Sequence, residues 1–376
     1  MKVLFISNDQ TVLEEHSSAR IRMREYARAM GELHIVTPAA RSDIIQDGTL
    51  HLYGVRTLRL FRVGALASRA RDIIVRHEIQ VVSAQDPFEQ GLAALKAIKG
   101  TAAKLHIQVH TDFLSPWFVR GGNIRSPRVP VPLLNRVRRH MADRVLPNAQ
   151  GIRVVSERIR SSIVARYGTR VPNPIVIPIR VSRIVPDPVS LPQRPFTFTL
   201  TTVGRLESEK RIQDSIAALA LIKDTHPTVG LYIIGEGSEK SRLKQYALSC
   251  GLGERVLFSH GWRTDAWGLV RSSQAYIQTS AYEGYGRTLL EAALASVPII
   301  TTDVGIVGEV FQGYTHVLSV PVADPAALSV HIRSLVEDVA LRTELSMHAR
   351  DAAEAHLARY DTSAEAMAAD LARLCL

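Results

Sequence analysis

The chain has little cysteine, no long hydrophobic run and no Asp-x-Asp sequence, and each absence excludes a class of protein. Its two cysteines, Cys250 and Cys375, are too few for a disulfide-stabilised secreted scaffold and lack metal-site spacing. Residues 1–6 form too short an apolar run for a signal peptide. No run approaches the roughly 18 apolar residues that span a bilayer. We therefore expect a cytoplasmic protein.

Short apolar runs rich in β-branched residues alternate with helical patterns such as residues 20–30, 90–98 and 212–222. This alternation predicts the α/β class, with parallel sheets covered by helices on both faces. The expected strands cover residues 3–6, 33–37, 81–84, 105–109, 154–156, 175–179, 196–203, 231–234, 256–258, 275–277 and 298–301.

A proline-rich join divides these strands into two sets. Residues 184–195 contain four prolines, a composition typical of linkers. The length of 376 residues also suits two domains of ordinary size. We predict an N-terminal domain over residues 1–188, a C-terminal domain over residues 189–360 and a final helix within residues 361–376.

Residues 278–302 are the most informative stretch. A short apolar run leads into a Glu-Gly-Tyr-Gly turn at residues 283–286, and a helix and a second strand follow. This order puts the helix N-terminus above a sheet's carboxyl edge, where its free backbone N–H groups favour an anion such as phosphate. Glu283 and Glu291 flank that point and can accept hydrogen bonds from hydroxyl groups beside a bound phosphate.

A second glycine turn opens the predicted C-terminal domain. Gly204 and Arg205 follow the strand at residues 196–203, and Lys210 lies five residues after the arginine. A helix is expected from residue 212, so this turn also lies at a sheet edge with an anion site above it. The charged heads of Arg205 and Lys210 can converge on one anion.

The two turns together suit a diphosphate leaving group. Enzymes stabilise the growing negative charge of such a group with a divalent metal or with fixed cations and backbone dipoles. The sequence shows neither Asp-x-Asp nor a His/Cys/Asp cluster with metal-site spacing. Arg205, Lys210 and the helix end at residues 286–289 provide the alternative, so we expect no metal and no other cofactor.

The motifs Gly-Arg-x4-Lys and Glu-Gly-Tyr-Gly-x4-Glu-Ala, in this order, resemble the signature of family 4 retaining glycosyltransferases. The resemblance covers most of the chain and is specific only in residues 196–325. It implies the GT-B fold, which has two Rossmann-like domains with doubly wound parallel sheets, an interdomain cleft and a last helix that crosses back to the first domain. The N-terminal domain would bind the acceptor, and the C-terminal domain would bind the nucleotide sugar.

The resemblance also implies roles for individual residues. Glu283 would face the donor sugar, and Glu291 would hold the ribose of the nucleotide. Arg205 and Lys210 would hold the diphosphate. The predicted donor-binding residues are Gly204, Gly235, Trp262, Gly284, Tyr285, Gly286, Arg287, Thr288, Leu289 and Glu291.

Arg287 departs from the family, whose members usually carry an apolar residue there. A guanidinium at a helix N-terminus opposes the helix dipole, at a cost of about 0.3–1 kcal/mol. Our hypothesis is that Arg287 contacts the diphosphate or a carboxylate on the sugar; simple exposure to solvent is the alternative. The family's glycine after Gly305 is Ile306 here, which leaves the edge of the donor pocket undefined.

The predicted N-terminal domain offers candidates for the acceptor side. His110 follows the strand at residues 105–109 and resembles a family histidine beside the donor sugar, although a core or surface histidine is equally consistent. Asp112 lies two residues further on. The family's Gly-Gly loop after the first strand is absent. Ser18 and Arg20, at a helix start, could contact an anionic acceptor or cap the helix.

Residues 116–185 contain fourteen arginines, no lysine and two acidic residues, within a chain of net charge +10. Residues 132–146 form a basic amphipathic segment in which Leu134, Val137, Met141 and Val145 share one helical face. It could pack on the core, dock on an anionic membrane surface or bind the phosphates of a lipid-linked acceptor. No motif for specific nucleic-acid binding is present.

These observations predict a metal-independent retaining glycosyltransferase. It would move a sugar from a nucleotide diphospho-sugar to a hydroxyl of a glycan or lipid-linked acceptor, in cell-surface polysaccharide or glycolipid biosynthesis. It would work in the cytoplasm or at the cytoplasmic face of the membrane. The alternatives are another GT-B enzyme, such as an epimerase or an inverting transferase, and a non-catalytic protein that binds sugar nucleotides or membranes.

Overall fold

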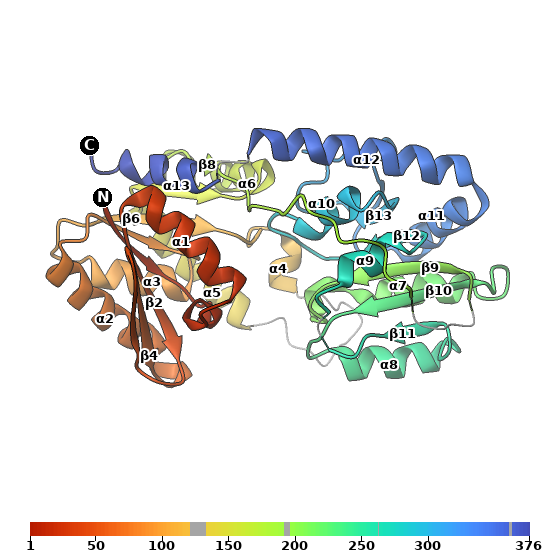
Figure 1. The fold of residues 1–376 in the computed structure, drawn as a ribbon, viewed down its shortest axis with the longest axis horizontal. Coiled ribbons are helices and arrows are strands. Elements are labelled where there is room, and N and C mark those ends of the chain that lie inside the picture. The colour runs from red at the N-terminus through yellow and green to blue at the C-terminus, as the bar shows by residue number, and fades with distance from the viewer. Residues whose placement is uncertain (121–132, 192–195, 262, 361–362) are drawn as a thin grey trace. The chain divides into compact units, whose positions relative to one another are not determined.

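The computed structural model describes residues 1–120, 133–191, 196–261, 263–360 and 363–376. The chain divides into two compact units (Figure 1). The first comprises Met1–Leu114, Leu133–Pro178 and Thr362–Leu376, and the second comprises Ser115–Pro132 and Ile179–Asp361.

The boundary lies ten residues before the predicted one, because part of the expected linker packs on the second unit. Val189 N donates to Gly268 O at 3.0 Å, and Arg271 Nη1 donates to Pro186 O at 3.4 Å. The stretch from residue 115 also belongs to the second unit, where Phe118 packs edge-on against Tyr282.

The first unit is built on an eight-stranded sheet of order β3-β4-β2-β1-β5-β6-β7-β8. All neighbouring strands are parallel except the β3–β4 pair. Neither strand of that pair was expected from the sequence; the outer strand, β3, alternates between exposed and half-buried positions, which gives little signal. The strands are β1 (Lys2–Ile6), β2 (Glu32–Ala39), β3 (Ile44–Asp47), β4 (Leu50–Arg56), β5 (Val81–Ala84), β6 (Lys104–Val109), β7 (Gly151–Val154) and β8 (Ile175–Val176).

The C-terminal helix belongs to this unit, as the resemblance implied. It packs on α1 through Met367 and Leu371, which share a buried cluster with Met23 and Met30. The helices of the unit are α1 (Ser18–Met30), α2 (Arg62–His77), α3 (Glu89–Ala97), α5 (Leu133–Val145), α6 (Glu157–Tyr167) and α13 (Ser363–Ala372). Its 3-10 turns are η1 (Gln10–Leu13), η2 (Arg59–Phe61), η3 (Leu146–Asn148) and η4 (Gly168–Arg170).

The second unit has a six-stranded, all-parallel sheet of order β11-β10-β9-β12-β13-β14. The strand order reverses at β9, so the loops that follow β9 and β12 leave the sheet side by side, where doubly wound folds bind ligands. The strands are β9 (Phe198–Val203), β10 (Val229–Ile234), β11 (Val256–Phe258), β12 (Ala275–Gln278), β13 (Ile299–Thr302) and β14 (Leu318–Val320), the last of which the sequence analysis missed.

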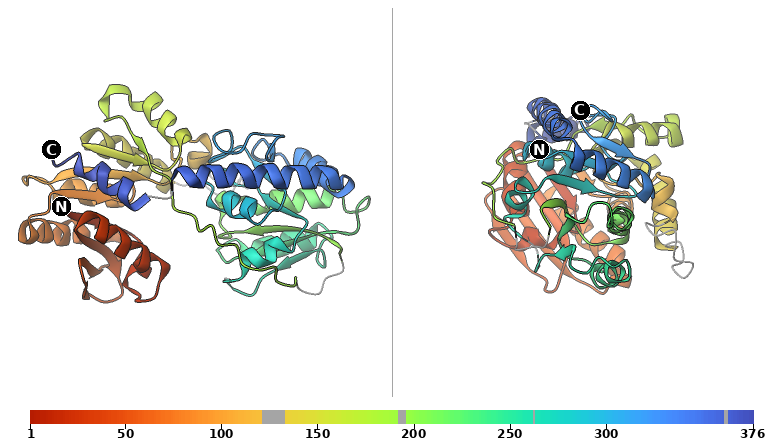
Figure 2. Two further views of the ribbon diagram at one scale, coloured as in Figure 1. Left: turned by 45° about the horizontal axis from the view of Figure 1, so that its top comes forward. Right: turned by 90° about the vertical axis from the view of Figure 1, so that its right-hand side faces the viewer.

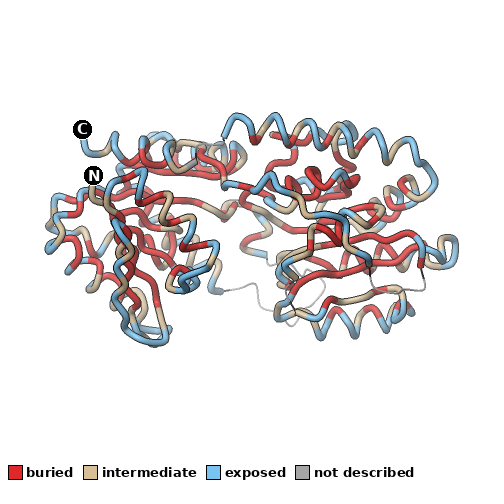
Figure 3. Tube along the Cα trace, viewed as in Figure 1, coloured by how far each residue is buried: buried red, intermediate tan, exposed pale blue. Residues whose placement is uncertain are grey.

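Helices cover both faces of this sheet, and α12, the long helix in Figure 2, packs against α10 and α11. The helices are α4 (Pro116–Arg120), α7 (Ile212–Leu221), α8 (Lys240–Ser249), α9 (Ala266–Arg271), α10 (Arg287–Leu294), α11 (Pro325–Glu337) and α12 (Val339–Arg359), with one 3-10 turn, η5 (Ser208–Lys210). Buried residues concentrate on the central strands of each unit (Figure 3). Within the described ranges, no helix combines the length and apolar character needed to cross a membrane.

We predict that Gly235→Ala destabilises the second unit. Gly235 has a φ of +150°, and a Cβ there would lie 1.9 Å from Gly204 O, so the backbone would have to move. Overpacking of this kind costs about 1–3 kcal/mol. Gly64→Ala is the control, because the added methyl meets nothing within 4 Å and lies in helix α2. Chemical unfolding should show a lower midpoint for Gly235→Ala only; an unchanged midpoint would contradict the close approach.

Candidate functional site

The two predicted turns meet at the carboxyl edge of the second sheet. They follow the neighbouring strands β9 and β12, and their backbones are joined directly. Ala281 N donates to Glu209 O at 2.7 Å, and Thr279 Oγ1 donates to Lys210 O at 3.1 Å. The stretches 204–211 and 279–286 therefore form one continuous surface.

Lys210 and Glu283 form an ion pair at the centre of this surface. Lys210 Nζ lies 2.5 Å from Glu283 Oε1, and both side chains are largely withdrawn from solvent. Ser280 Oγ donates to the same carboxylate oxygen at 2.8 Å. Two residues that lie seventy-three positions apart are thus held in one place and one orientation.

Arg205 lies on the same loop but faces solvent. Its guanidinium contacts Glu209 Oε1 at 3.0 Å, and two-thirds of its side chain is exposed. The Glu209 side chain is only 19% exposed, so the exposed member of the pair is the arginine. The exposed guanidinium of Arg205 is therefore accessible to another anion.

Helix α10 begins beside these charges. Its N-cap, Gly286, has a φ of +97°, and no hydrogen bond from a side chain of the described residues caps the helix. Gly305, in the loop after β13, also has a positive φ, and a Cβ there would lie 2.4 Å from Tyr285 O. Gly286 is needed for its positive φ, and Gly305 also lets its backbone approach that of Tyr285. The N–H groups of the first turn of α10 are the feature that attracts an anion.

Arg287 pairs with Glu291 one turn along α10. Arg287 Nη2 lies 2.7 Å from Glu291 Oε1, with about half of the arginine side chain exposed and only a tenth of the glutamate. Burial raises the pKa of Glu291, and the adjacent Arg287 opposes that rise. The anion that compensates Arg287 in this structure is therefore Glu291, the residue predicted to hold ribose.

Gln278, at the end of β12, is a polar residue that the sequence analysis did not single out. It is buried; its Oε1 accepts from Thr288 Oγ1 at 2.6 Å, and its Nε2 has no hydrogen-bond partner in the described structure. Its position at the carboxyl end of a predicted central strand could have identified it as a candidate site residue. A buried amide donor without a partner is costly, so it fits a site that a ligand completes.

Tyr285 turns its side chain away from the anion site. Its hydroxyl lies 2.7 Å from His356 Nε2 on α12, and the ring is buried. Burial raises the pKa of Tyr285 and lowers the pKa of His356 to about 4, so both are neutral at pH 7. If Tyr285 contacts a ligand, it therefore does so through its backbone.

The loop that carries Gly235 adjoins the Arg205 loop. Leu206 N donates to Glu236 O at 2.8 Å, and Gly235 N donates to Ser259 Oγ at 3.1 Å. The loops that follow β9, β10 and β11 are thus joined. Trp262, one of the predicted donor-binding residues, lies outside the described residues.

Arg211 was also missed as an organising residue. It adopts a left-handed backbone, is buried and pairs with Asp214 at 2.6 Å. Its guanidinium lies 5.5 Å from the centroid of the Trp117 ring, so it links α4 to the Lys210 loop. The sequence showed it only as the last charge of a polar run.

In the first unit, His110 directly follows β6 and lies half-buried. Its Nε2 is 3.1 Å from Gln108 Oε1, which also accepts from Arg153 Nη1 at 2.9 Å. Burial, and then Arg153 and Arg22, lower the pKa of His110 to about 3, so it is neutral at pH 7. A neutral imidazole can accept a hydrogen bond but carries no charge.

The predicted acceptor residues have different environments. Ser17, not Ser18, caps α1 by accepting from Arg20 N at 3.0 Å, and Ser18 is exposed. The Arg20 side chain is buried and paired with Asp47 at 2.9 Å, because the unexpected β3–β4 hairpin carries that carboxylate. Arg20 is therefore occupied by an ion pair within its own unit. Asp112 is buried.

Asp86, which follows β5, has a carboxyl group with a raised pKa. Its Oδ1 accepts from Phe88 N at 2.7 Å, and burial raises the pKa of its carboxyl group to about 7. It follows the strand next to β1, where the order of the first sheet reverses. Its position resembles that of the candidate site in the second unit.

The basic amphipathic segment forms α5 and packs only along part of its length. Val145 is buried and Met141 is half-buried, whereas Leu134 and Val137 each expose 42% of their surface. Arg138 pairs with Glu89 at 3.0 Å. Packing on the core, the first of the three possibilities for this segment, therefore explains only the apolar residues in the C-terminal half of the helix. Residue 132, the first residue of the predicted segment, lies outside the described structure.

Comparison with known proteins matches both units to one family. Residues 191–352 match the model of "Glycosyl transferases group 1", and residues 21–179 match that of "Glycosyltransferase Family 4". Glycogen synthase of Mycobacterium tuberculosis is 37% identical over 153 residues, which are 40% of this chain and 37% of the synthase. Lipopolysaccharide 1,6-galactosyltransferase of Salmonella typhimurium is 32% identical over 40% of this chain and 42% of that protein. The matches thus span less than half of these relatives.

Solved structures resemble the fold over nearly the whole chain. Sucrose-phosphate synthase of Thermosynechococcus elongatus has a TM-score of 0.81 at 18% identity, covering 100% of this chain and 99% of that one. Anabaena HepE in complex with UDP-glucose has a TM-score of 0.72 at 18% identity, covering 98% and 100%. With two parallel-sheet α/β units and matches to the family along both, the chain belongs to the family 4 glycosyltransferases and has the GT-B fold.

Proposed function

We propose that the protein is a retaining glycosyltransferase that uses a nucleotide diphospho-sugar, with UDP as the first nucleotide to test. The observation that carries the proposal is the meeting of Lys210, Glu283 and the α10 N-terminus at the switch point of the second sheet. A relative that makes glycogen and one that builds lipopolysaccharide support a glycan or lipid-linked acceptor. The resemblance to the HepE complex supports a UDP-linked donor.

The charges of the site suit departure of a nucleoside diphosphate. As the sugar–phosphate bond breaks, negative charge grows on the diphosphate, and fixed cations and backbone dipoles stabilise it. Lys210 is already positioned, and Arg205 exchanges Glu209 for a phosphate oxygen. The N–H groups at the start of α10 complete the anion site. These groups supply the stabilisation without a metal ion, which is part of the proposal.

Glu283 would act on the sugar. Lys210 and Ser280 hold its carboxylate in one orientation. From there it accepts a hydrogen bond from a sugar hydroxyl and stabilises positive charge that develops at the anomeric carbon. Glu291, buried beside the helix end, accepts from the ribose hydroxyls, and the Gln278 amide is a further donor for the nucleotide sugar.

The first unit would supply the acceptor side. Neutral His110 can accept a hydrogen bond from a sugar hydroxyl, and Ser18 and Asp112 remain candidates for the acceptor. The exposed Leu134 and Val137 lie on a helix with Arg136 and Arg139, a composition that suits an anionic membrane surface. Peripheral binding at the cytoplasmic face is therefore included in the proposal.

We predict that a UDP-sugar raises the melting temperature and is hydrolysed or transferred. The panel should contain UDP-, GDP- and ADP-linked sugars, and the anomeric configuration of the product should be read by proton NMR. Glu283→Gln should retain donor binding but lose transfer, whereas Glu254→Gln, an exposed change in the same unit, should behave as wild type. Inversion at the anomeric carbon would support an inverting enzyme instead. Binding without turnover by the wild type would support a non-catalytic protein.

A second prediction concerns Arg287. If it leaves Glu291 to contact the diphosphate or a sugar carboxylate, Arg287→Leu should weaken donor binding about 10-fold or more, since a hydrogen bond to a charged group contributes about 1.5–3 kcal/mol. Arg350→Leu is a matched control, because Arg350 forms the same i,i+4 pair with Glu354 on α12. Calorimetric titration measures both. Unchanged donor affinity and preference in Arg287→Leu would mean that Arg287 does not contact the donor.

A further inference from the structure

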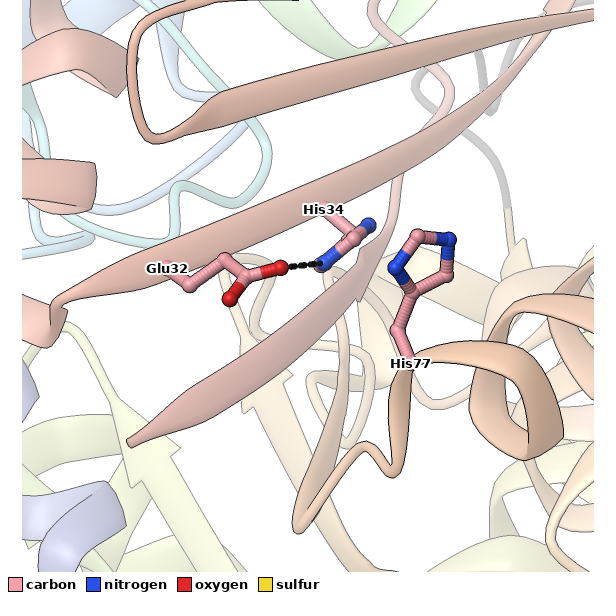
Figure 4. A group of neighbouring side chains, drawn as sticks. All are labelled: Glu32, His34 and His77. Atoms are coloured by element: carbon pink, nitrogen blue, oxygen red, sulfur yellow. Dashed lines mark hydrogen bonds and ion pairs between the residues drawn. The ribbon is translucent and has the colours of Figure 1, made fainter.

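A group of histidines and one glutamate lies at the amino edge of the first sheet (Figure 4). Glu32 and His34 come from β2, and His77 ends α2. One ligand atom from each of the three lies within 4.8 Å of the other two. Glu32 Oε1 and His34 Nε2 are 2.8 Å apart, and a ring nitrogen of His77 faces them in Figure 4.

The fold itself brings these side chains together. Glu32 and His34 are two residues apart on a strand, so they point to the same face of the sheet. His51 pairs with His34 in the parallel register of β2 and β4, and the two rings stack at 4.6 Å. The His77 ring lies 4.4 Å from that of His34, because α2 ends over this face.

A tyrosine behind the group orients its rings. Tyr53 OH lies 3.0 Å from His34 Nδ1 and 3.5 Å from His77 Nε2. Hydrogen bonds of this kind fix the tautomer and the direction of a metal-binding histidine.

We propose that Glu32, His34 and His77 bind one divalent transition-metal ion of the zinc type. Two imidazoles and a carboxylate are ligands that Zn²⁺ accepts, with bonds of roughly 2.0–2.2 Å. Tetrahedral bonds of that length place ligand atoms about 3.3 Å apart. The Glu32–His34 contact therefore opens by about half an ångström and His77 moves inward. His51, with Nε2 3.8 Å from Glu32 Oε1, is the nearest side chain to a fourth position.

The location assigns the ion a structural role. Glu32 is the first residue of β2 and His77 the last of α2, whereas the candidate catalytic loops follow the carboxyl ends of strands. An ion here would join β2 to α2 at the opposite edge of the first sheet. It would stabilise that unit and take no part in sugar transfer.

The competing explanation is a hydrogen-bond network, since His34 already has partners for both ring nitrogens. Metal titration separates the two. Untagged full-length protein, freed of metal by dialysis against a chelator, is titrated with Zn²⁺ in competition with a chromophoric chelator. We expect one tight site per chain. Co²⁺ in the same site should give the visible absorption bands of a tetrahedral ion.

The variants test the ligands individually. His77→Ala should lower Zn²⁺ affinity by at least the 10–100-fold that loss of an outer-shell partner costs. Glu32→Gln keeps a hydrogen-bond acceptor for His34 and should also weaken Zn²⁺ binding. It therefore tests the site even if His77→Ala does not fold. His140→Ala removes an exposed histidine from α5 and should change nothing. Wild type that binds Zn²⁺ no more tightly than His77→Ala and Glu32→Gln would overturn the proposal.

Discussion

The candidate site depends on the direct joining of two backbone turns at the point where the second sheet reverses its strand order. Ala281 N donates to Glu209 O, so the turn after β12 is fixed against the turn after β9. This contact fixes where Lys210 and Glu283 meet, and hence where a cation, a carboxylate and a helix N-terminus coincide. Without it the same residues would be unrelated surface charges.

The charges of the site are balanced in pairs. Lys210 pairs with Glu283, Arg205 with Glu209 and Arg287 with Glu291. A highly charged diphosphate enters such a site by replacing a carboxylate as the partner of a cation, and the carboxylate is released toward sugar or ribose hydroxyls. In the pairs of Arg205 and Arg287 the arginine is exposed and can turn toward a ligand, whereas both members of the Lys210–Glu283 pair are largely withdrawn from solvent.

Much of the fold could be predicted because the buried parallel strands are short continuous apolar runs. β3, β4 and β14 were missed; β3 and β14 are only four and three residues long and give little signal. Motif spacing placed Lys210 and Glu283 correctly on adjacent loops, because neighbouring strands bring their carboxyl ends together. It could not show that Arg20 is bound by Asp47 or that Tyr285 turns toward His356. Those contacts depend on β3 and α12, elements distant in sequence from the motifs.

If the site works as proposed, both turns contact one bound nucleoside diphosphate. Amide hydrogen exchange with and without UDP tests this most directly, because the turns lie in separate peptides. We expect UDP to slow exchange in residues 204–211 and in residues 284–291 together, and to leave exchange in the outer helix α8 unchanged. Protection of one turn alone, or of neither at saturating UDP, would contradict it.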